Sequence, residues 1–257
     1  MDTNRIAQLF GLDGRVAIVT GATRGIGRSI AEGFVDAGAT VVVVSRKADA
    51  VDETVQSLRK RGGTVLGVAA HLGDLDDIQR IVNSTVLAFG GIDIVINNAA
   101  TALSQPLGAL TAEAWAKVND VNLRGPVFLI EAALPHLVAS KHASIINVIS
   151  AGAYLASTAS AMYASTKSGL LSFTRTMAAE YASRGIRVNA LAPGTVETDM
   201  VTNNTPEAQQ RMANACWMKR MARPDEMVGP ALFLASDAAS YVTGQVVIAD
   251  GGLVAAR

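Results

Sequence analysis

Residues 20–27, Thr20-Gly21-Ala22-Thr23-Arg24-Gly25-Ile26-Gly27, decide the fold of this chain. They follow a β-branched run at residues 16–20, which predicts a buried strand, and lead into a helical pattern at residues 25–37. Glycines permit a tight turn and a close approach of the backbone to a pyrophosphate, and the helix N-terminus adds free N–H groups and a positive dipole end. A Gly-rich turn can also be a plain connection, but its place after the first strand favours a dinucleotide-binding loop. No Gly-Lys-Ser/Thr closes the turn, so it is not a P-loop.

Short apolar runs alternate with helical patterns along the rest of the chain. Further strands are expected at residues 40–45, 64–69, 92–97, 144–150, 187–192 and 246–249. The helices between them include residues 112–139 and 160–183, and another begins near Pro224. Continuous apolar strands separated by helices predict a parallel sheet covered on both faces. The expected fold class is therefore α/β, a Rossmann-type doubly wound sheet of about seven strands in a single domain, residues 1–257.

The composition narrows the class of partner. Lys and Arg number 22, Asp and Glu number 22, and 50% of the residues are hydrophobic. A net charge of zero argues against a nucleic-acid or membrane-surface partner. Cys216 is the only cysteine, which rules out an intrachain disulfide and a cysteine-cluster metal site, and no histidine spacing suggests a metal. Without a signal-like or membrane-length apolar run, a cytoplasmic protein is expected.

The end of the second expected strand indicates which nicotinamide cofactor the loop binds. It reads Ser45-Arg46-Lys47, and no acidic residue appears before Asp49. A carboxylate here would bind the ribose hydroxyls of NAD, whereas a guanidinium binds a 2′-phosphate. Arg24 in the glycine turn offers a second positive charge. These residues favour NADP(H); in the alternative interpretation, Arg46 and Lys47 are only a solvated strand end.

Three polar residues suggest acid–base chemistry. Tyr163 and Lys167 lie four residues apart in an expected helix and so share one face. A nearby ammonium is expected to lower the pKa of the phenol, so the pair can serve as a general acid and base. Ser150 ends the fifth expected strand, where α/β sheets bind ligands, and can hold a substrate oxygen. Its neighbours are not those of a Gly-x-Ser-x-Gly nucleophile.

Residues 199–223 contain no expected strand but hold several apolar side chains, among them Met200, Met212 and Trp217. Two interpretations stay open for this segment. It is either a substrate lid over a pocket or a surface connection with some packed apolar residues.

In this order, the motifs resemble the short-chain dehydrogenase/reductase family, over residues 12–252. The matching motifs are Thr20 to Gly27, Asn97-Asn98-Ala99-Ala100, Asn122, Ser150, Tyr163 with Lys167, Pro193-Gly194-Thr195-Val196-Glu197-Thr198, and Asp250-Gly251-Gly252. The glycine spacing and the length are similar to those of the single-domain reductase branch, which includes 3-oxoacyl carrier-protein reductases. Sugar-acid dehydrogenases are similar as well.

The resemblance implies a role for each matched residue. Tyr163 would donate a proton to a carbonyl oxygen, Lys167 would lower the pKa of Tyr163 and bind the nicotinamide ribose, and Ser150 would hold the substrate oxygen. Asn122 would hold a water that links Lys167 to solvent. The implied cofactor-binding residues are Gly21, Thr23, Arg24, Gly25, Ile26, Gly27, Ser45, Arg46, Lys47, His71, Leu72, Asn98, Ala99, Ala100, Tyr163, Lys167, Pro193, Gly194, Val196 and Thr198.

Two positions depart from the family pattern. Ala100 replaces a glycine, and its methyl group is expected to crowd the cofactor slightly. His71 stands where the family has Asp or Asn, either contacting adenine or leaving that contact to the backbone N–H of Leu72. The resemblance also implies a homotetramer, with helices 112–139 and 160–183 pairing across one two-fold axis and the C-terminal segment across another.

The sequence therefore predicts an enzyme that transfers hydride between NADP(H) and a small carbonyl or secondary alcohol. An apolar ketone or a 3-oxoacyl thioester fits an expected pocket formed by Ser150, Ala151, Tyr154, Leu155, Gly194, Met200 and Trp217. Two alternatives stay open: an NAD-dependent alcohol or sugar-acid dehydrogenase, and a non-catalytic nucleotide-binding member of the family.

Overall fold

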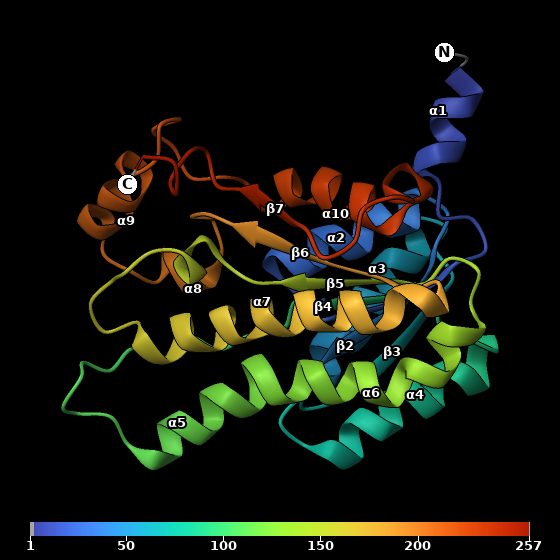
Figure 1. Cartoon of the computed structure of the whole chain (residues 1–257), viewed down its shortest axis with the longest axis horizontal. Helices are drawn as coiled ribbons and strands as arrows, with labels where there is room; N and C mark the ends of the chain where they lie inside the picture. The colour runs from blue at the N-terminus through green and yellow to red at the C-terminus, as the bar shows by residue number, and fades with distance from the viewer. Residues whose placement is uncertain (1–2, 257) are drawn as a thin grey trace.

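The computed structural model describes residues 3–256 and contains one sheet of seven parallel strands (Figure 1). The strands are β1 (Val16–Thr20), β2 (Thr40–Ser45), β3 (Val65–Ala69), β4 (Ile94–Asn97), β5 (Ser144–Val148), β6 (Arg187–Pro193) and β7 (Val246–Ala249). Their order across the sheet is β3-β2-β1-β4-β5-β6-β7. This arrangement confirms the predicted doubly wound fold.

The order of the strands reverses at β1, which pairs with β2 on one side and with β4 on the other. Thr20 lies opposite Val44, and Val19 lies opposite Ile96, so the carboxyl ends of these three strands reach the same edge of the sheet. Ligands of doubly wound sheets bind in the crevice at such a point. The glycine turn that follows β1 therefore opens into this crevice.

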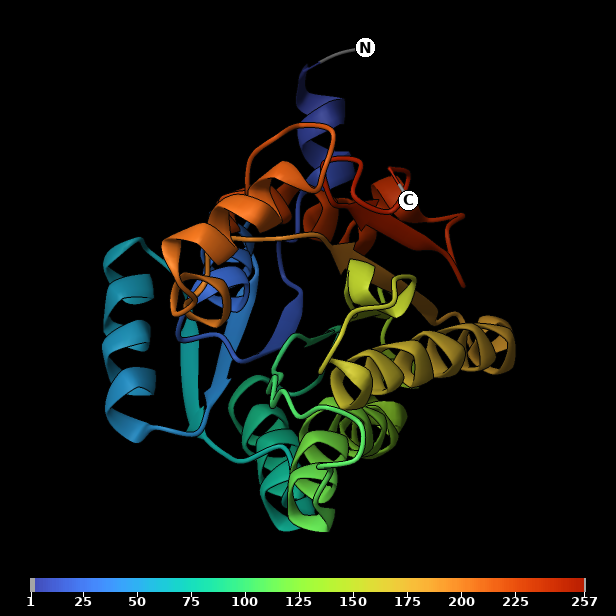
Figure 2. The same ribbon diagram turned by 90° about the vertical axis from the view of Figure 1, so that its left-hand side faces the viewer.

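Ten α-helices surround the sheet in the described part of the chain. They are α1 (Thr3–Phe10), α2 (Gly25–Asp36), α3 (Ala48–Lys60), α4 (Leu75–Phe89), α5 (Ala112–Asn119), α6 (Gly125–Ala139), α7 (Ala161–Tyr181), α8 (Asp199–Thr202), α9 (Pro206–Asn214) and α10 (Val228–Ala235). Buried side chains of α2, α3 and α10 pack on one face of the sheet, and those of α4, α6 and α7 pack on the other. Figure 2 shows the two layers on opposite sides of the strands.

The expected helix at residues 112–139 contains an irregularity that the apolar pattern did not reveal. Between α5 and α6 lies a π-helical segment, η1 (Asp120–Arg124), with the buried Asn122 at its centre. Such segments are often found at functional sites because they re-aim side chains. The structure thus confirms helical backbone through residues 112–139, but the π-helical turn at Asp120–Arg124 points its side chains in other directions than a regular α-helix would.

Several boundaries also differ from the expected ones. β4 begins at Ile94 rather than residue 92, and the side chain of the preceding Asp93 accepts a hydrogen bond from the Val16 N–H at 2.8 Å. β5 ends at Val148 rather than Ser150, because the Ser150 side chain accepts the Gly152 N–H and turns the chain. No pattern in the sequence predicted α1, α8 or α9. Within residues 3–256, no helix combines the length and the apolar character needed to cross a membrane.

The packing of α2 on the sheet yields a test of the fold. Phe34 of α2 is completely buried among β1, β2, α3 and α10. Phe34→Ala should lower the free energy of unfolding by about 3–5 kcal/mol, because it removes apolar contacts and leaves a cavity. Leu87→Ala, at a position 90% exposed, is the control and should change it by less than about 0.5 kcal/mol. Urea unfolding measures both, and equal losses would contradict the packing of α2 described above.

Candidate active site

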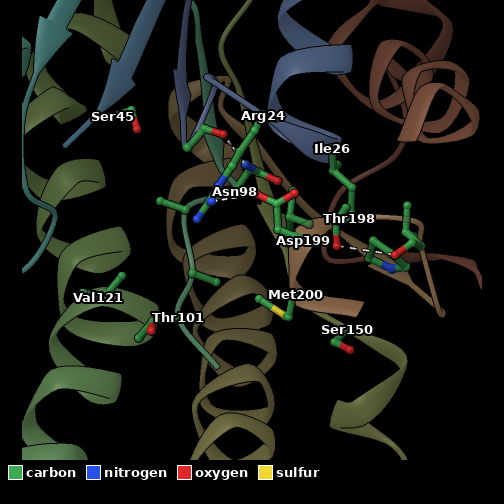
Figure 3. A pocket seen from close by; sticks show the side chains of 18 of the residues that line it. Arg24, Ile26, Ser45, Asn98, Thr101, Val121, Ser150, Thr198, Asp199 and Met200 are labelled. Atoms are coloured by element: carbon green, nitrogen blue, oxygen red, sulfur yellow. Dashed lines mark hydrogen bonds and ion pairs between the residues drawn. The ribbon is translucent and has the colours of Figure 1, made fainter. Parts of the chain in front are cut away.

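A cavity of about 360 Å³ opens at the carboxyl edge of the sheet (Figure 3). Its walls come from the segments that follow β1 to β6, together with α8 and α9. The lining includes every residue implied above to bind the cofactor except Lys47, and it includes Ser150, Tyr163 and Lys167. The glycine turn and the acid–base residues therefore share one cavity.

The glycine turn is held against the end of β4 by reciprocal hydrogen bonds. The Thr20 Oγ1 accepts the N–H groups of Asn98 at 2.9 Å and Ala99 at 3.0 Å. The Asn98 Nδ2 donates to the Thr20 carbonyl at 2.8 Å. A Cβ atom at Gly27 would lie only 2.3 Å from the Asn98 Nδ2 and 2.4 Å from the Gly21 carbonyl oxygen. The close packing of this turn therefore requires a glycine at position 27.

The N-terminus of α2 faces the cavity without a side-chain cap. Arg24 occupies the N-cap position in an extended conformation, and its side chain makes no capping hydrogen bond. The following residues, Gly25, Ile26 and Gly27, line the cavity. Free N–H groups and the helix dipole favour an anion at this point. The turn thus has the shape and the polarity that a pyrophosphate requires.

The basic residues at the end of β2 are not equivalent. Ser45 and Arg46 line the cavity, and the Thr23 Oγ1 donates to the Ser45 Oγ at 3.1 Å. Arg46 is exposed and has no hydrogen bond or ion pair with another described residue. Lys47 is the exposed N-cap residue of α3 and does not belong to the lining. Geometry therefore separates Arg46 from Lys47, which the sequence grouped together.

His71 and Leu72 lie after β3 on the same wall. The backbone N–H of His71 donates to the Asp77 Oδ2 at 2.7 Å, and the His71 Nδ1 accepts the Gly73 N–H at 3.1 Å. Because Nδ1 acts as an acceptor, a neutral His71 carries its proton on Nε2. Nδ1 of the ring thus faces the Gly73 N–H, and the donor nitrogen Nε2 is on the opposite side of the ring.

The pKa of the Tyr163 phenol differs from the value expected from the sequence. Burial raises the pKa of Tyr163, and the hydrogen bond from the Ser150 hydroxyl acts in the lowering direction. The expected lowering of the phenol pKa by Lys167 is not found: burial raises this pKa, and the Ser150 hydroxyl is the group that acts in the lowering direction. The phenol keeps its proton at neutral pH and can act as an acid.

Lys167 is buried directly behind the phenol. Its Nζ donates to the Val148 carbonyl at 2.7 Å and lies 5.7 Å from the centre of the Tyr163 ring. Burial lowers the pKa of Lys167 from 10.5 to about 8. The amine can therefore gain or lose a proton near neutral pH, unlike an exposed lysine.

Asn122 does not line the cavity but lies behind it. Its Oδ1 accepts the Thr101 N–H at 2.8 Å, and its Nδ2 donates to the Thr101 carbonyl at 2.9 Å and to the Thr166 Oγ1 at 3.3 Å. The π-helical turn therefore ties the cavity wall at Thr101 to α7, next to Lys167. The sequence missed the contributions of Thr20 and Thr101: Thr20 belongs to the glycine-turn motif, but no role was assigned to its side chain, and Thr101 lies outside the motifs.

The far wall comes from the segment after β6. Pro193, Gly194, Val196 and Thr198 line the cavity there. A Cβ atom at Gly194 would lie 2.7 Å from the Asp250 Cα, so this wall depends on a close approach of two backbones. The Asp250 carboxylate accepts the N–H groups of Gly252 and Val254, which gives the Asp250-Gly251-Gly252 motif a structural role.

The expected substrate residues are only partly assembled. Ser150, Gly194 and Met200 line the cavity, whereas Ala151, Tyr154 and Leu155 do not. Trp217 lies in a separate hollow, where it packs against Gly252. The position of Trp217 within residues 199–223 did not reveal this placement, because residues 216–218 line the separate hollow and not the cavity. No group of three or more metal-ligating side chains occurs within residues 3–256.

A doubly wound sheet with a glycine turn and a Ser-Tyr-Lys group in one crevice defines the class of dehydrogenases and reductases. The chain belongs to the short-chain dehydrogenase/reductase family: residues 21–254 match the family described as Enoyl-(Acyl carrier protein) reductase. It is an oxidoreductase of this family, acting on CH–OH or C=O groups.

Individual relatives extend over nearly the whole chain. The 3-oxoacyl-(acyl-carrier-protein) reductase FabG of Thermotoga maritima is 35% identical over 243 residues, covering 95% of this chain and 99% of that protein. Dehydrogenase/reductase SDR family member 4 of Bos taurus is 38% identical, with coverages of 94% and 88%. A gluconate 5-dehydrogenase from Burkholderia cenocepacia, solved with NADP and tartrate, has a TM-score of 0.92 at 32% identity, with coverages of 97% and 99%.

The low pKa of Lys167 predicts how stability depends on pH. Between about pH 8 and its ordinary pKa of 10.5, the folded protein binds fewer protons at Lys167 than the unfolded chain, so the free energy of unfolding rises with pH. Relative to Lys167→Met, the wild type should gain about 2 kcal/mol between pH 8 and about 9.5. Urea unfolding at several pH values measures this gain. A difference that stays constant over this range would contradict the burial of an ionisable amine.

Proposed function

We propose that this chain transfers hydride between NADP(H) and a small-molecule carbonyl or secondary alcohol. The observation that carries the proposal is the single cavity shared by the glycine turn and by Ser150, Tyr163 and Lys167. NADP(H) is favoured over NAD(H) because Arg46 lines this cavity with no partner among the described residues. Solved relatives with NADP bound support the same choice.

The residues present fit a dinucleotide. The turn at Gly21, Gly25 and Gly27 leaves no room for side chains, and the uncapped start of α2 would hold the pyrophosphate. The remaining cavity-lining residues implied by the resemblance would hold the adenosine and the nicotinamide ribose. When bound, the nicotinamide supplies or accepts the hydride at the substrate carbon.

The chain's own residues then handle the proton. The Ser150 hydroxyl would hydrogen-bond the substrate oxygen, and Tyr163, whose raised pKa keeps it protonated, would donate its proton to that oxygen during reduction. Lys167 would return a proton toward the phenolate, since a pKa of about 8 permits exchange near neutral pH. Asn122 would position Lys167 through Thr166 and hold the water that links the amine to solvent.

The cavity wall favours an apolar substrate such as a ketone or a 3-oxoacyl thioester. Val121, Ile149, Met200, Val201 and Met212 contribute apolar lining, with the last three in the proposed lid at residues 199–223. A second candidate is a sugar-acid dehydrogenase. Lys117 at the cavity offers a cation for a carboxylate, and the related gluconate 5-dehydrogenase supports this reading.

We also propose the homotetramer and the cytoplasmic location expected from the sequence. Exposed Trp115, Phe128 and Phe173 on α5, α6 and α7 support pairing of these helices with a second copy. Burying these large apolar side chains between two copies would remove them from water and stabilise the assembly.

Loss of the phenol tests the chemistry. Tyr163→Phe should bind NADPH as the wild type does but lower kcat by at least about 100-fold, because the proton donor is gone. Tyr154→Phe removes the hydroxyl of a tyrosine outside the cavity and should keep full activity. Steady-state reduction of a ketone panel, together with NADPH fluorescence titration, measures both. Undiminished turnover in Tyr163→Phe would overturn the proposed mechanism.

Charge reversal at the end of β2 tests the cofactor. Arg46→Asp should weaken NADPH binding at least about tenfold and leave NADH binding unchanged or tighter, because a carboxylate repels a 2′-phosphate. Lys47→Asp makes the same change of charge one residue outside the cavity and should have a much smaller effect. Fluorescence titration with each cofactor measures the two dissociation constants. Unchanged NADPH affinity in Arg46→Asp would refute the NADP(H) assignment.

A further inference from the structure

An ion pair joins the glycine turn to the lid at the cavity. The Arg24 Nη1 donates to the Asp199 Oδ2 at 2.7 Å, and both residues line the cavity. Figure 3 shows the Arg24 side chain reaching from the turn toward Asp199, the first residue of α8. The cation that the sequence assigned to a phosphate thus already has a carboxylate partner.

The two segments also touch beside the ion pair. A Cβ atom at Gly25 would lie 2.9 Å from the Thr198 Cγ2, so residues 24–25 face residues 198–199 directly. The ion pair is therefore accompanied by a second contact, the close approach of Gly25 to the Thr198 side chain. Arg24 and Asp199 are held within reach of each other by the fold.

The ion pair is isolated and exposed. The Arg24 and Asp199 side chains are 72% and 58% exposed, and within residues 3–256 neither makes another hydrogen bond or ion pair. Exposed pairs of this kind are weak and are screened by salt. An incoming anion of higher charge can therefore take the place of Asp199.

A 2′-phosphate is such an anion. It carries about two negative charges at neutral pH and presents several oxygens to a guanidinium, whereas Asp199 carries one charge. We propose that Asp199 is a specificity-determining residue, the resident counterion that the 2′-phosphate of NADP(H) must displace from Arg24. The inference rests on the proposed use of NADP(H). NADH has no 2′-phosphate and leaves the pair intact, so Asp199 narrows the difference in affinity between the two cofactors.

The test is the ratio of the NADH to the NADPH dissociation constant, measured by fluorescence titration at low ionic strength. Asp199→Asn should raise this ratio about two- to fivefold, because the phosphate no longer competes with a carboxylate. Asp36→Asn is the matched control: it removes another exposed aspartate–arginine pair, with Arg61, outside the cavity, and should leave the ratio unchanged. Thermal melting checks that both variants fold, and Asp199→Ser repeats the test with a different side chain.

A double-mutant cycle separates competition from a general change of charge. In an Arg24→Gln background, Asp199→Asn should no longer raise the ratio. If Asp199→Asn instead tightens both cofactors equally, or if its gain persists without Arg24, the proposal is overturned.

The proposed function can fail separately. A wild type that binds NADH as tightly as NADPH, with Arg24→Gln and Arg46→Asp both neutral, would overturn the NADP(H) assignment and this inference together. A preference for NADPH that Arg46→Asp abolishes but Asp199→Asn leaves unchanged would overturn this inference alone.

Discussion

The hydroxyl of Thr20 is the contact on which the site depends. It is buried at the end of β1, donates to the Ile96 carbonyl and accepts two N–H groups from the segment after β4. Since β1 and β4 flank the reversal of strand order, this one group fixes the two sides of the crevice against each other. The side chain of Asn98 completes the clamp by filling the space that a side chain at Gly27 would need.

A second set of hydrogen bonds connects the crevice to Lys167 and to the helix that holds Tyr163. Lys167 is attached to β5 through the Val148 carbonyl, and Ser150 lies two residues beyond the end of this strand, where it caps the turn at Ala151–Ala153. The π-helical turn at Asn122 joins α7 to the loop after β4 through Thr166 and Thr101. The Val148 carbonyl of β5 and the Asn122 side chain therefore help to set the position of Lys167 and of α7 relative to the cavity.

The sequence predicted the sheet well because each strand is an apolar run bounded by turn residues. It also placed Ser150 at the edge where parallel strands end, whereas the grouping of Ser150 with the helical Tyr163 and Lys167 came from the family resemblance. It did not predict the π-helical turn, because one additional residue in a helical turn leaves the apolar pattern almost intact. The raised pKa of Tyr163 was missed for a different reason: the spacing of Tyr163 and Lys167 reveals their proximity but not the depth at which both are buried.

The separation of Lys47 from Arg46 likewise needed coordinates, because two adjacent basic residues look alike in the sequence although only Arg46 lines the cavity. The helices α8 and α9 in the 199–223 segment have few buried residues. They therefore show no apolar stripe from which a helix could be predicted.

The glycine turn and the basic residues beside it differ in what the fold requires of them. Gly27 cannot accept even a methyl group without moving Asn98, whereas Arg46 contributes no bond to the described fold and Arg24 contributes one exposed ion pair. Gly27 is thus fixed by packing, while Arg24 and Arg46, which we propose to contact the cofactor, can be exchanged at little cost in stability. In evolutionary terms, the basic residues that we propose to select one dinucleotide over another can drift in this scaffold while the glycine turn persists.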